Sequence, residues 1–339
     1  MLLVYDEIYG DHLRGIPHPE SPDRVAVVAD FLRRRGAFDR RVAARDARDD
    51  EILEAHCAHY LETVKREVGR LGESAAYLST GDTAVDARSL DVARRAAGGA
   101  IAAMEATVER SEASFAIVRP PGHHAESNRG MGFCIFNNAA IAARAFRRAG
   151  GGRVLIADFD YHHGNGTQEL SGNGISYLSS HASPAYPGTG SVRDNRFRAG
   201  DALINVTLPP HAFGTEPFVA LWERLLPLVA ARVRPELLIV SAGFDYVAGD
   251  PVGDLGVDVE AARALGACAN AVAQEWCAGR IVYLLEGGYE VQALARSVGL
   301  VFDAHDSGEH RASGAEIDAL PVLQREMISG IERVLGEPG

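Results

Sequence analysis

Short apolar runs alternate with longer amphipathic segments along most of the chain. The apolar runs lie at 2–5, 115–118, 154–157, 174–178, 237–240 and 281–285. Between several of them, alanine-rich segments repeat their apolar positions with a helical period, at 90–109, 138–149, 217–233 and 259–278. Strands buried on both faces are continuously apolar, and strands that alternate with helices form parallel sheets covered by helices. The pattern therefore predicts an open, mostly parallel α/β fold with helices on both faces of the sheet.

The rest of the chain adds little to this picture. The sequence contains no internal repeat, no low-complexity tract and no convincing linker. Residues 303–339 carry no motif that indicates chemistry, and we expect a tail with a polar loop and a final helix over 319–335. We therefore predict a single domain over residues 1–339 rather than two.

The composition excludes several classes of protein. The chain has 339 residues and a formal charge of −12, whereas a nucleic-acid-binding protein needs a basic surface. No uncharged stretch approaches the roughly 20 residues that span a bilayer, and the first residues do not resemble a signal peptide. The four cysteines lack the spacing of a disulfide framework or thiolate zinc site. We expect a reduced, cytoplasmic protein without nucleic-acid or membrane partners; the oligomeric state stays open.

Residues that can do chemistry follow four of the predicted strands. In open α/β sheets, ligands bind beyond the carboxyl ends of the strands. The segments at these ends are Arg119-Pro-Pro-Gly-His-His-Ala125, Asp158-Phe-Asp-Tyr-His-His-Gly-Asn-Gly166, Ser241-Ala-Gly-Phe-Asp245 and Glu286-Gly-Gly-Tyr289. We expect the His, Asp and Tyr side chains of these segments to form one site.

Asp160 and His162 form a D-x-H pair directly after a strand. Residues two apart on extended backbone point the same way, so one carboxylate and one imidazole can meet one cation. Alone, such a pair is more often an exposed loop feature. Together with Asp245 from a second strand end, it indicates a zinc-type site that keeps an open position, as catalytic sites do. Zinc in such a site polarises a carbonyl and activates water near neutral pH.

His123 and His124 provide a possible acid and base. An exposed loop pair or one core histidine is the alternative interpretation, with about even odds for the pair alone. At a strand end beside a metal, a histidine can transfer protons near neutral pH. Asp158 and Asn165 are plausible partners of the two rings, and the ring that faces the amide is more easily kept neutral.

Tyr289 could simply cover the core, but beside a metal its hydroxyl can stabilise a developing oxyanion. Metal, base, acid and oxyanion donor together are sufficient for amide or ester hydrolysis, and no Ser or Cys nucleophile stands in a recognisable setting. Cys134, in Phe133-Cys-Ile-Phe136, is expected to be packed in a strand or helix entry.

The chain resembles the zinc-dependent histone deacetylase family, which includes bacterial acetylpolyamine amidohydrolases. The resemblance extends from about residue 4 to 289. Its specific segments are Arg119-Pro-Pro-Gly-His-His-Ala125, Gly132-Phe-Cys-Ile-Phe-Asn-Asn138, Asp158-Phe-Asp-Tyr-His-His-Gly-Asn-Gly-Thr-Gln168 and Leu285-Glu-Gly-Gly-Tyr289. It implies an arginase-like α/β fold with an eight-stranded parallel sheet.

The resemblance also implies residue roles. It makes His124 the general base beside His123, and Tyr289 the residue that polarises the scissile carbonyl. The implied zinc ligands are Asp160, His162 and Asp245. A structural potassium ion is implied at Asp158, Ser179 and Ser180. The implied substrate-binding residues are the tunnel walls Phe133 and Tyr186, the rim carboxylate Asp82, and Gly132, Val252 and Gly287.

Details of the motifs favour a class II-like deacetylase of acetyl-lysine or a similar short-chain acyl-lysine. Asn165 stands where class I enzymes have Asp, and apolar Val252 stands where polyamine deacetylases can carry an acidic residue. An amidohydrolase of acetylpolyamines or other small acetylated amines remains the alternative. A non-catalytic acyl-lysine-binding protein is disfavoured by the intact His123, His124 and Tyr289, and a two-manganese ureohydrolase by the single set of ligands.

Two further features have ordinary explanations. His56 and His59 are spaced to share a metal, but no third ligand is evident, and a structural role is the better prediction. Arg24 matches an arginine near the buried end of the family's tunnel, and a salt bridge is an equally good explanation for it.

Overall fold

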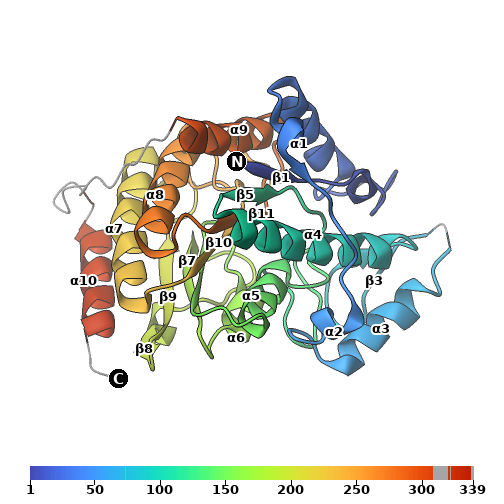
Figure 1. The fold of residues 1–339 in the computed structure, drawn as a ribbon, viewed down its shortest axis with the longest axis horizontal. Helices are drawn as coiled ribbons and strands as arrows, with labels where there is room; N and C mark the ends of the chain where they lie inside the picture. Colours follow the sequence, from blue (N-terminus) through green and yellow to red (C-terminus); the bar gives the residue numbers. More distant parts are fainter. Residues whose placement is uncertain (73, 308–319, 321, 337–339) are drawn as a thin grey trace.

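The fold is built on one central sheet. The computed structural model describes residues 1–72, 74–307, 320 and 322–336 (Figure 1). In these residues the sheet order is β2-β1-β5-β11-β10-β6-β7-β9-β8. The strands are β1 (Leu2–Val4), β2 (Arg41–Val42), β5 (Ser114–Ala116), β6 (Val154–Asp158), β7 (Ile175–Ala182), β8 (Arg196–Arg198), β9 (Asp201–Leu208), β10 (Leu237–Ala242) and β11 (Ile281–Leu285).

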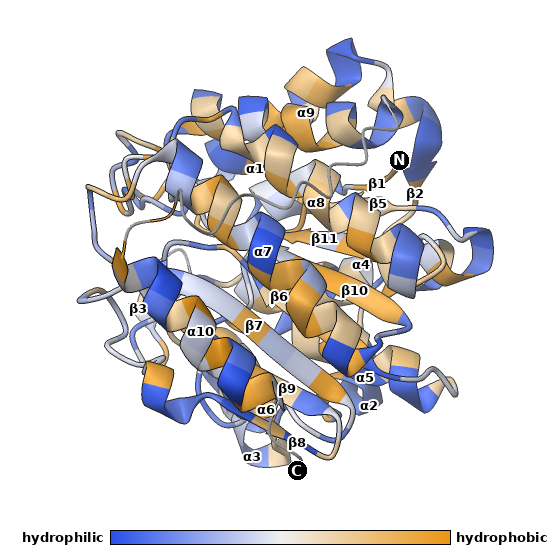
Figure 2. Cartoon of the chain, turned by 90° about the vertical axis from the view of Figure 1, so that its left-hand side faces the viewer, coloured by the Kyte–Doolittle hydropathy of each residue, from blue (hydrophilic) through white to orange (hydrophobic). Residues whose placement is uncertain are grey.

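Eight of these strands are parallel, as predicted. The ninth strand, β8, pairs antiparallel with β9 at one edge, and the apolar runs of the sequence did not predict β2, β8 or β9. All residues of β6, β10 and β11 are buried, which agrees with their continuous apolar runs, and β6 and β10 are largely hydrophobic in Figure 2. Burial on both faces stabilises these central strands through removal of apolar surface from water.

Helices pack in two groups. One group is a continuous series of contacts from α1 (Pro22–Arg34) through α9 (Val291–Asp306) and α8 (Ala261–Trp276) to α7 (Thr215–Val233). The other pairs α4 (Ser89–Arg110) with α5 (Asn138–Arg148), and Figure 1 shows this pair on the opposite side of the sheet from α8 and α9. The α/β architecture with helices on both faces is therefore confirmed.

Shorter elements and one terminal helix complete the fold. The four predicted helices correspond to α4, α5, α7 and α8 within two residues at each end. In the tail, α10 is found over Val322–Gly336, and residue 319, where the prediction began, lies outside the described residues. The remaining elements are α2 (Asp49–Ile52), α3 (Ala58–Val68), α6 (Asn165–Leu170), the hairpin β3 (Ala76–Tyr77) and β4 (Ala84–Val85), and 3-10 helices at Glu7–Gly10, Ala37–Arg40 and Val192–Asp194.

None of the described helices has both the length and the apolar character that crossing a membrane requires.

Candidate active site

The four strand ends selected from the sequence meet at one edge of the sheet. Strands β5, β11, β10 and β6 are consecutive neighbours in it. Parallel strands present their carboxyl ends on the same side, so the loops after these strands lie together. His123 Nε2 lies 3.8 Å from Asp160 Oδ1, and the rings of His124 and His162 are 5.9 Å apart between centroids. The segments that follow β5 and β6 thus converge on one site.

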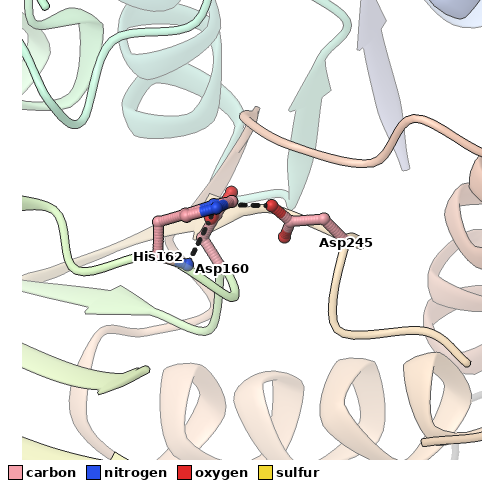
Figure 3. A group of neighbouring side chains, drawn as sticks. All are labelled: Asp160, His162 and Asp245. Carbon is pink, nitrogen blue, oxygen red and sulfur yellow. Dashed lines mark hydrogen bonds and ion pairs between the residues drawn. The ribbon is translucent and has the colours of Figure 1, made fainter. Parts of the chain in front are cut away.

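Asp160, His162 and Asp245 form the group of described His, Cys, Asp and Glu residues that is suited to hold a metal ion. One ligand atom of each lies within 4.8 Å of the others, and all three side chains are buried. Figure 3 shows the three side chains turned toward one another. His162 Nδ1 is 2.9 Å from Asp245 Oδ2 and 3.2 Å from Asp160 Oδ1. Two carboxylates and an imidazole from two strand ends therefore point at one common centre.

The donor set fits a divalent cation. Asp245 Oδ2 is buried and lies 2.9 Å from His162 Nδ1, but no hydrogen bond of good geometry satisfies it, and a bound cation would. Burial and the charge of Asp160 raise the pKa of Asp245 to about 7, since two buried carboxylates lie together. Burial alone would lower the pKa of His162, but the adjacent carboxylates of Asp160 and Asp245 raise it to about 10. The cluster attracts positive charge, and this donor set is one that zinc accepts.

Backbone groups fix the two carboxylates. Asp160 Oδ1 accepts a hydrogen bond from the His162 amide at 2.8 Å, and Asp160 Oδ2 accepts one from the Gly287 amide at 2.8 Å. Asp245 Oδ1 accepts from the Tyr161 amide at 2.9 Å. Each of these hydrogen bonds orients one carboxylate oxygen of Asp160 or Asp245. Groups that hydrogen-bond to metal ligands commonly orient them in this way.

Gly287 leaves room for both carboxylates. A Cβ atom at this position would lie 2.5 Å from Asp245 Oδ2 and 2.6 Å from Asp160 Oδ2. The family resemblance implied that Gly287 binds substrate, whereas the structure places it against the carboxylates of Asp160 and Asp245.

Gly287→Ala should therefore weaken zinc affinity by about 10- to 100-fold, the range seen when groups that support metal ligands are changed. Competition with a fluorescent chelator measures this affinity. Gly330→Ala, at an open position in α10, is the matched control and should bind zinc as the unmodified chain does. Unchanged affinity of Gly287→Ala would mean that the carboxylates do not need this space.

The two adjacent histidines have different partners, as expected. His123 Nδ1 lies 3.1 Å from Asp158 Oδ2, and His124 Nδ1 lies 2.8 Å from Asn165 Oδ1. Burial lowers the pKa of His123, but the carboxylates of Asp160 and Asp158 outweigh it and raise this pKa well above 6.5. Burial and the neighbouring imidazoles lower the pKa of His124 well below 6.5. The pKa values of the two adjacent imidazoles are therefore shifted in opposite directions, which favours the cationic form of His123 and the neutral form of His124.

Tyr289 lies in the loop after β11, partly exposed to the pocket described below. Its amide donates to Asp250 Oδ2 at 2.6 Å, and the guanidinium of Arg24 lies over its ring, 4.8 Å from the centroid. Burial raises the pKa of the Tyr289 hydroxyl well above 10, so the hydroxyl keeps its proton at neutral pH. A protonated phenol is able to donate a hydrogen bond to an oxyanion.

A pocket of about 1050 Å³ leads from the surface to these groups. Phe133 and Tyr186 lie at its wall. The ring centroid of Phe133 is 5.9 Å from that of Tyr289. The ring centroid of Tyr186 is 5.2 Å from that of His124. Asp82 lies exposed in the loop between β3 and β4, and its carboxylate accepts from the Gly132 amide at 2.8 Å and the Tyr186 hydroxyl at 3.0 Å. The described residues that line the pocket are Tyr77, Gly81, Asp82, His124, Gly132, Phe133, Tyr161, His162, Pro184, Ala185, Tyr186, Pro210, His211, Val252 and Tyr289.

The residues expected at a potassium site lie beside each other. Asp158 pairs with Ser179 in the β6–β7 register, and both are fully buried. Asp158 Oδ2 also accepts from the Tyr177 hydroxyl at 2.8 Å, and Ser180 Oγ accepts from Trp222 Nε1 at 3.0 Å. The potassium ion itself stays a prediction.

Two buried carboxylates that support the site, Glu286 and Asp250, were not predicted from the sequence. Glu286 Oε2 accepts from the amides of Gly122 and His123 at 2.7 and 3.1 Å, and Asp250 holds the Tyr289 amide. Glu286 directly follows β11, so its position at a strand end was an available signal. Nothing in the local pattern of Asp250 indicated its contact.

The remaining candidates have structural surroundings. His56 is buried and accepts from the Asn137 amide at 2.9 Å, whereas His59 is exposed, so the two do not share a metal site. Arg24 is fully buried and forms the expected salt bridge to Glu20 at 3.0 Å, in addition to its position over Tyr289. Cys134 is buried in the loop that leads to α5, in agreement with a packed helix entry.

The fold and the site together match one class of protein: the chain belongs to the histone deacetylase family, whose domain, the histone deacetylase domain, matches residues 18–305. It is similar to a probable deacetylase of Archaeoglobus fulgidus, with 34% identity over 298 residues, covering 86% of this chain and 81% of the relative. It is also similar to histone deacetylase 15 of Arabidopsis thaliana, with 32% identity over 344 residues, covering 98% of this chain and 59% of the relative.

A solved structure agrees with this assignment. The crystal structure of the HDA15 HD domain superimposes with a TM-score of 0.85 and 29% identity, and the match covers 98% of this chain and 94% of that chain. The deacetylase-like fold expected from the motifs is therefore confirmed.

Proposed function

We propose that this protein is a zinc-dependent amidohydrolase that removes acetyl or another short acyl group from the side-chain amide of lysine. Family membership supports deacetylase activity. The observation that carries the proposal is that His124, Tyr289 and His162 line the same pocket, and that His162 belongs to the buried cluster it forms with Asp160 and Asp245.

Zinc held by Asp160, His162 and Asp245 would supply a Lewis acid that polarises the amide carbonyl and lowers the pKa of water. The side chains do the rest. His124, neutral and held at Nδ1 by Asn165, accepts a proton at Nε2 from the attacking water. The Tyr289 hydroxyl donates a hydrogen bond to the carbonyl oxygen as negative charge develops there. A histidine of the pair then protonates the leaving amine.

His123 has a different task in this scheme. Its hydrogen bond to Asp158 and its raised pKa keep it cationic, so it adds positive charge beside the reacting groups. The buried carboxylates of Asp158 and Glu286 offset that charge and hold the histidine loop in place. A structural potassium ion at Asp158, Ser179 and Ser180 belongs to the same proposal.

The pocket favours an acyl-lysine over a polyamine. Its walls include the aromatic rings of Phe133 and Tyr186 and the apolar side chain of Val252, which suit an alkyl chain. Among the described lining residues, Asp82 supplies the one carboxylate, and this carboxylate already binds Gly132 and Tyr186. A polycation would gain little electrostatic stabilisation from such a lining.

Metal analysis combined with a matched substrate panel tests this proposal. Purified protein should contain one zinc per chain, and acetyl-lysine peptides should be hydrolysed with higher kcat/KM than acetylputrescine or acetylspermidine. A reversed preference would support the polyamine amidohydrolase instead. Stoichiometric zinc without hydrolysis of either class would contradict the enzymatic role and favour a non-catalytic acyl-lysine-binding protein.

Tyr289→Phe should lower kcat by about 10²- to 10³-fold, the usual cost of removing one oxyanion donor. Zinc content should not change, because Tyr289 is not a ligand in this scheme. Steady-state rates on an acetyl-lysine peptide and metal analysis measure both effects. Tyr283→Phe removes a buried hydroxyl that bonds His305 away from the site and is the control. A Tyr289→Phe variant with an unchanged kcat would remove Tyr289 from the mechanism.

The cysteines fit the proposed cytoplasmic location. All four are free thiols, and Cys134, Cys268 and Cys277 are buried. Free thiols persist in a reducing compartment.

A further inference from the structure

We propose that Glu126 is a positioning residue that fixes the tautomer of His124 through the side-chain amide of Asn165. The inference rests on the proposed function, in which His124 accepts a proton at Nε2. Asn165 lies between the two other residues: its Oδ1 is 2.8 Å from His124 Nδ1, and its Nδ2 is 2.7 Å from Glu126 Oε1. His124 and Asn165 are both buried, so the partners of this amide are protein groups.

The chemistry of these contacts allows one arrangement of hydrogens. An ionised carboxylate accepts hydrogen bonds and cannot donate them, so the amide must turn its NH₂ toward Glu126. Its oxygen then faces His124 Nδ1, which has to carry a hydrogen in order to donate. A neutral imidazole has one ring hydrogen, so Nε2 of His124 is left unprotonated. This is the nitrogen that can accept a proton.

The reversed amide is disfavoured by every group around Nδ2. In the observed orientation Nδ2 also lies 3.4 Å from the carbonyl oxygen of His124 and 3.3 Å from the sulfur of Met131. With the amide reversed, its oxygen would face two oxygens and a sulfur, all of them acceptors. The ring hydrogen of His124 would then have to move to Nε2, where it blocks proton acceptance. Glu126 carries the only full negative charge among these three acceptors, so it contributes most to the preference.

Glu126 is itself held firmly. Its amide donates to the Arg129 carbonyl oxygen at 2.9 Å, and its carbonyl oxygen lies 2.9 Å from His56 Nδ1. The Asn137 amide donates to His56 Nε2, so Nδ1 is the nitrogen of His56 that donates to Glu126. This buried histidine therefore anchors the backbone from which Glu126 reaches Asn165.

Substitutions that exchange hydrogen-bond donors and acceptors at Glu126 and Asn165 test the inference. Glu126→Gln keeps the shape but offers Asn165 an amide that can donate or accept, so both orientations become accessible. We expect kcat to fall about tenfold with little change in KM or zinc content. General-base catalysis contributes about 10²- to 10⁴-fold, and only the fraction of molecules with the wrong tautomer of His124 would lose it. Asn165→Asp alone places two carboxylates against each other and should also lower kcat. In the double variant Glu126→Gln/Asn165→Asp, the introduced glutamine can donate to the new carboxylate, which again accepts from His124 Nδ1, so most of the loss should be recovered.

A spectroscopic measurement separates this role from a merely structural one. In zinc-loaded protein with ¹⁵N-labelled histidine, long-range ¹H–¹⁵N spectra report which ring nitrogen of His124 carries the hydrogen. We expect the Nδ1–H form in the unmodified protein and in the double variant, and a mixture of forms in Glu126→Gln. Glu169→Gln is the matched control: Glu169 accepts from the neighbouring Ser127 at 2.6 Å, and its replacement should change neither tautomer nor kcat.

The outcomes are distinguishable from failure of the proposed function. If the unmodified protein hydrolyses no acylated amine, the function fails while the tautomer measurement still decides the role of Glu126. If Glu126→Gln retains a pure Nδ1–H form, or if the double variant is no better than either single variant, the positioning role of Glu126 is wrong. A tautomer mixture in Glu126→Gln that the second substitution reverses establishes it.

Discussion

Asp245→Ala is expected to purify without stoichiometric zinc and to lose deacetylase activity. The carboxylate is fully buried in the loop after β10 and lies 2.9 Å from His162 Nδ1, and with Asp160 and His162 it completes the group of described residues suited to hold a metal ion. Removal leaves two ligands, too few for a zinc site with an open position. Several kcal/mol of transition-state stabilisation come with the metal, so turnover should fall by at least about 10³-fold. Metal analysis and peptide hydrolysis measure the two losses.

A second substitution separates loss of a ligand from loss of structure. Asp245 Oδ1 also accepts from the Tyr161 amide, and Asp245→Asn keeps an oxygen for this bond while it removes the charge. It should therefore fold and still bind zinc poorly. Asp91→Ala, at an exposed position of α4, is the control for removal of one acidic residue. Stoichiometric zinc in a folded Asp245→Ala protein would show that Asp245 is not a ligand.

His124→Ala is expected to lower kcat by about 10²- to 10⁴-fold, the contribution typical of a general base. His124 is buried, its pKa is held well below 6.5 by burial and by the neighbouring imidazoles, and its Nδ1 is engaged with Asn165. It is therefore neutral and oriented, and its loss removes the proton acceptor without removing a metal ligand. The drop should appear in kcat with zinc content unchanged, which distinguishes this variant from Asp245→Ala.

His59→Ala provides the comparison, because His59 is exposed on α3 away from the described pocket. The His59→Ala variant should have the activity of the unmodified chain.

His123→Ala should, like His124→Ala, be less active than the unmodified chain, since it removes the ring bonded to Asp158. Near-normal turnover of His124→Ala would move the base role to His123 or to another group.

Much of the fold was predictable because strands buried on both faces have continuous apolar sequences. The runs at 154–157, 237–240 and 281–285 are apolar at every position because β6, β10 and β11 are covered on both faces. β9 was not predicted. Its sequence, Asp201–Leu208, is interrupted by Asn205 and Thr207, and Asn205 is accommodated in the interior by a hydrogen bond to Gln168. A polar residue in a buried strand depends on a partner that a local pattern does not contain.

Parts of the candidate site were equally readable. Asp160 and His162 lie two residues apart after a buried strand, so local backbone geometry alone brings them to one side. The rule that ligands bind at the carboxyl ends of strands then selected Asp245 and Tyr289. The resemblance to a known family supplied roles for tunnel residues such as Phe133, which composition and spacing could not.

The apolar runs of the sequence predict six of the nine strands of the sheet, the residues that follow these strands and the chemistry that those residues can do. The tertiary structure alone decided that β5, β11, β10 and β6 are neighbours, and so that Asp245 meets Asp160. It also revealed the contacts of Glu126 with Asn165 and of Glu286 with the histidine loop. These contacts join residues about 40 or more positions apart, and chain order does not specify strand order. Local periodicity records burial, whereas side-chain partners are set by how the strands are arranged in space.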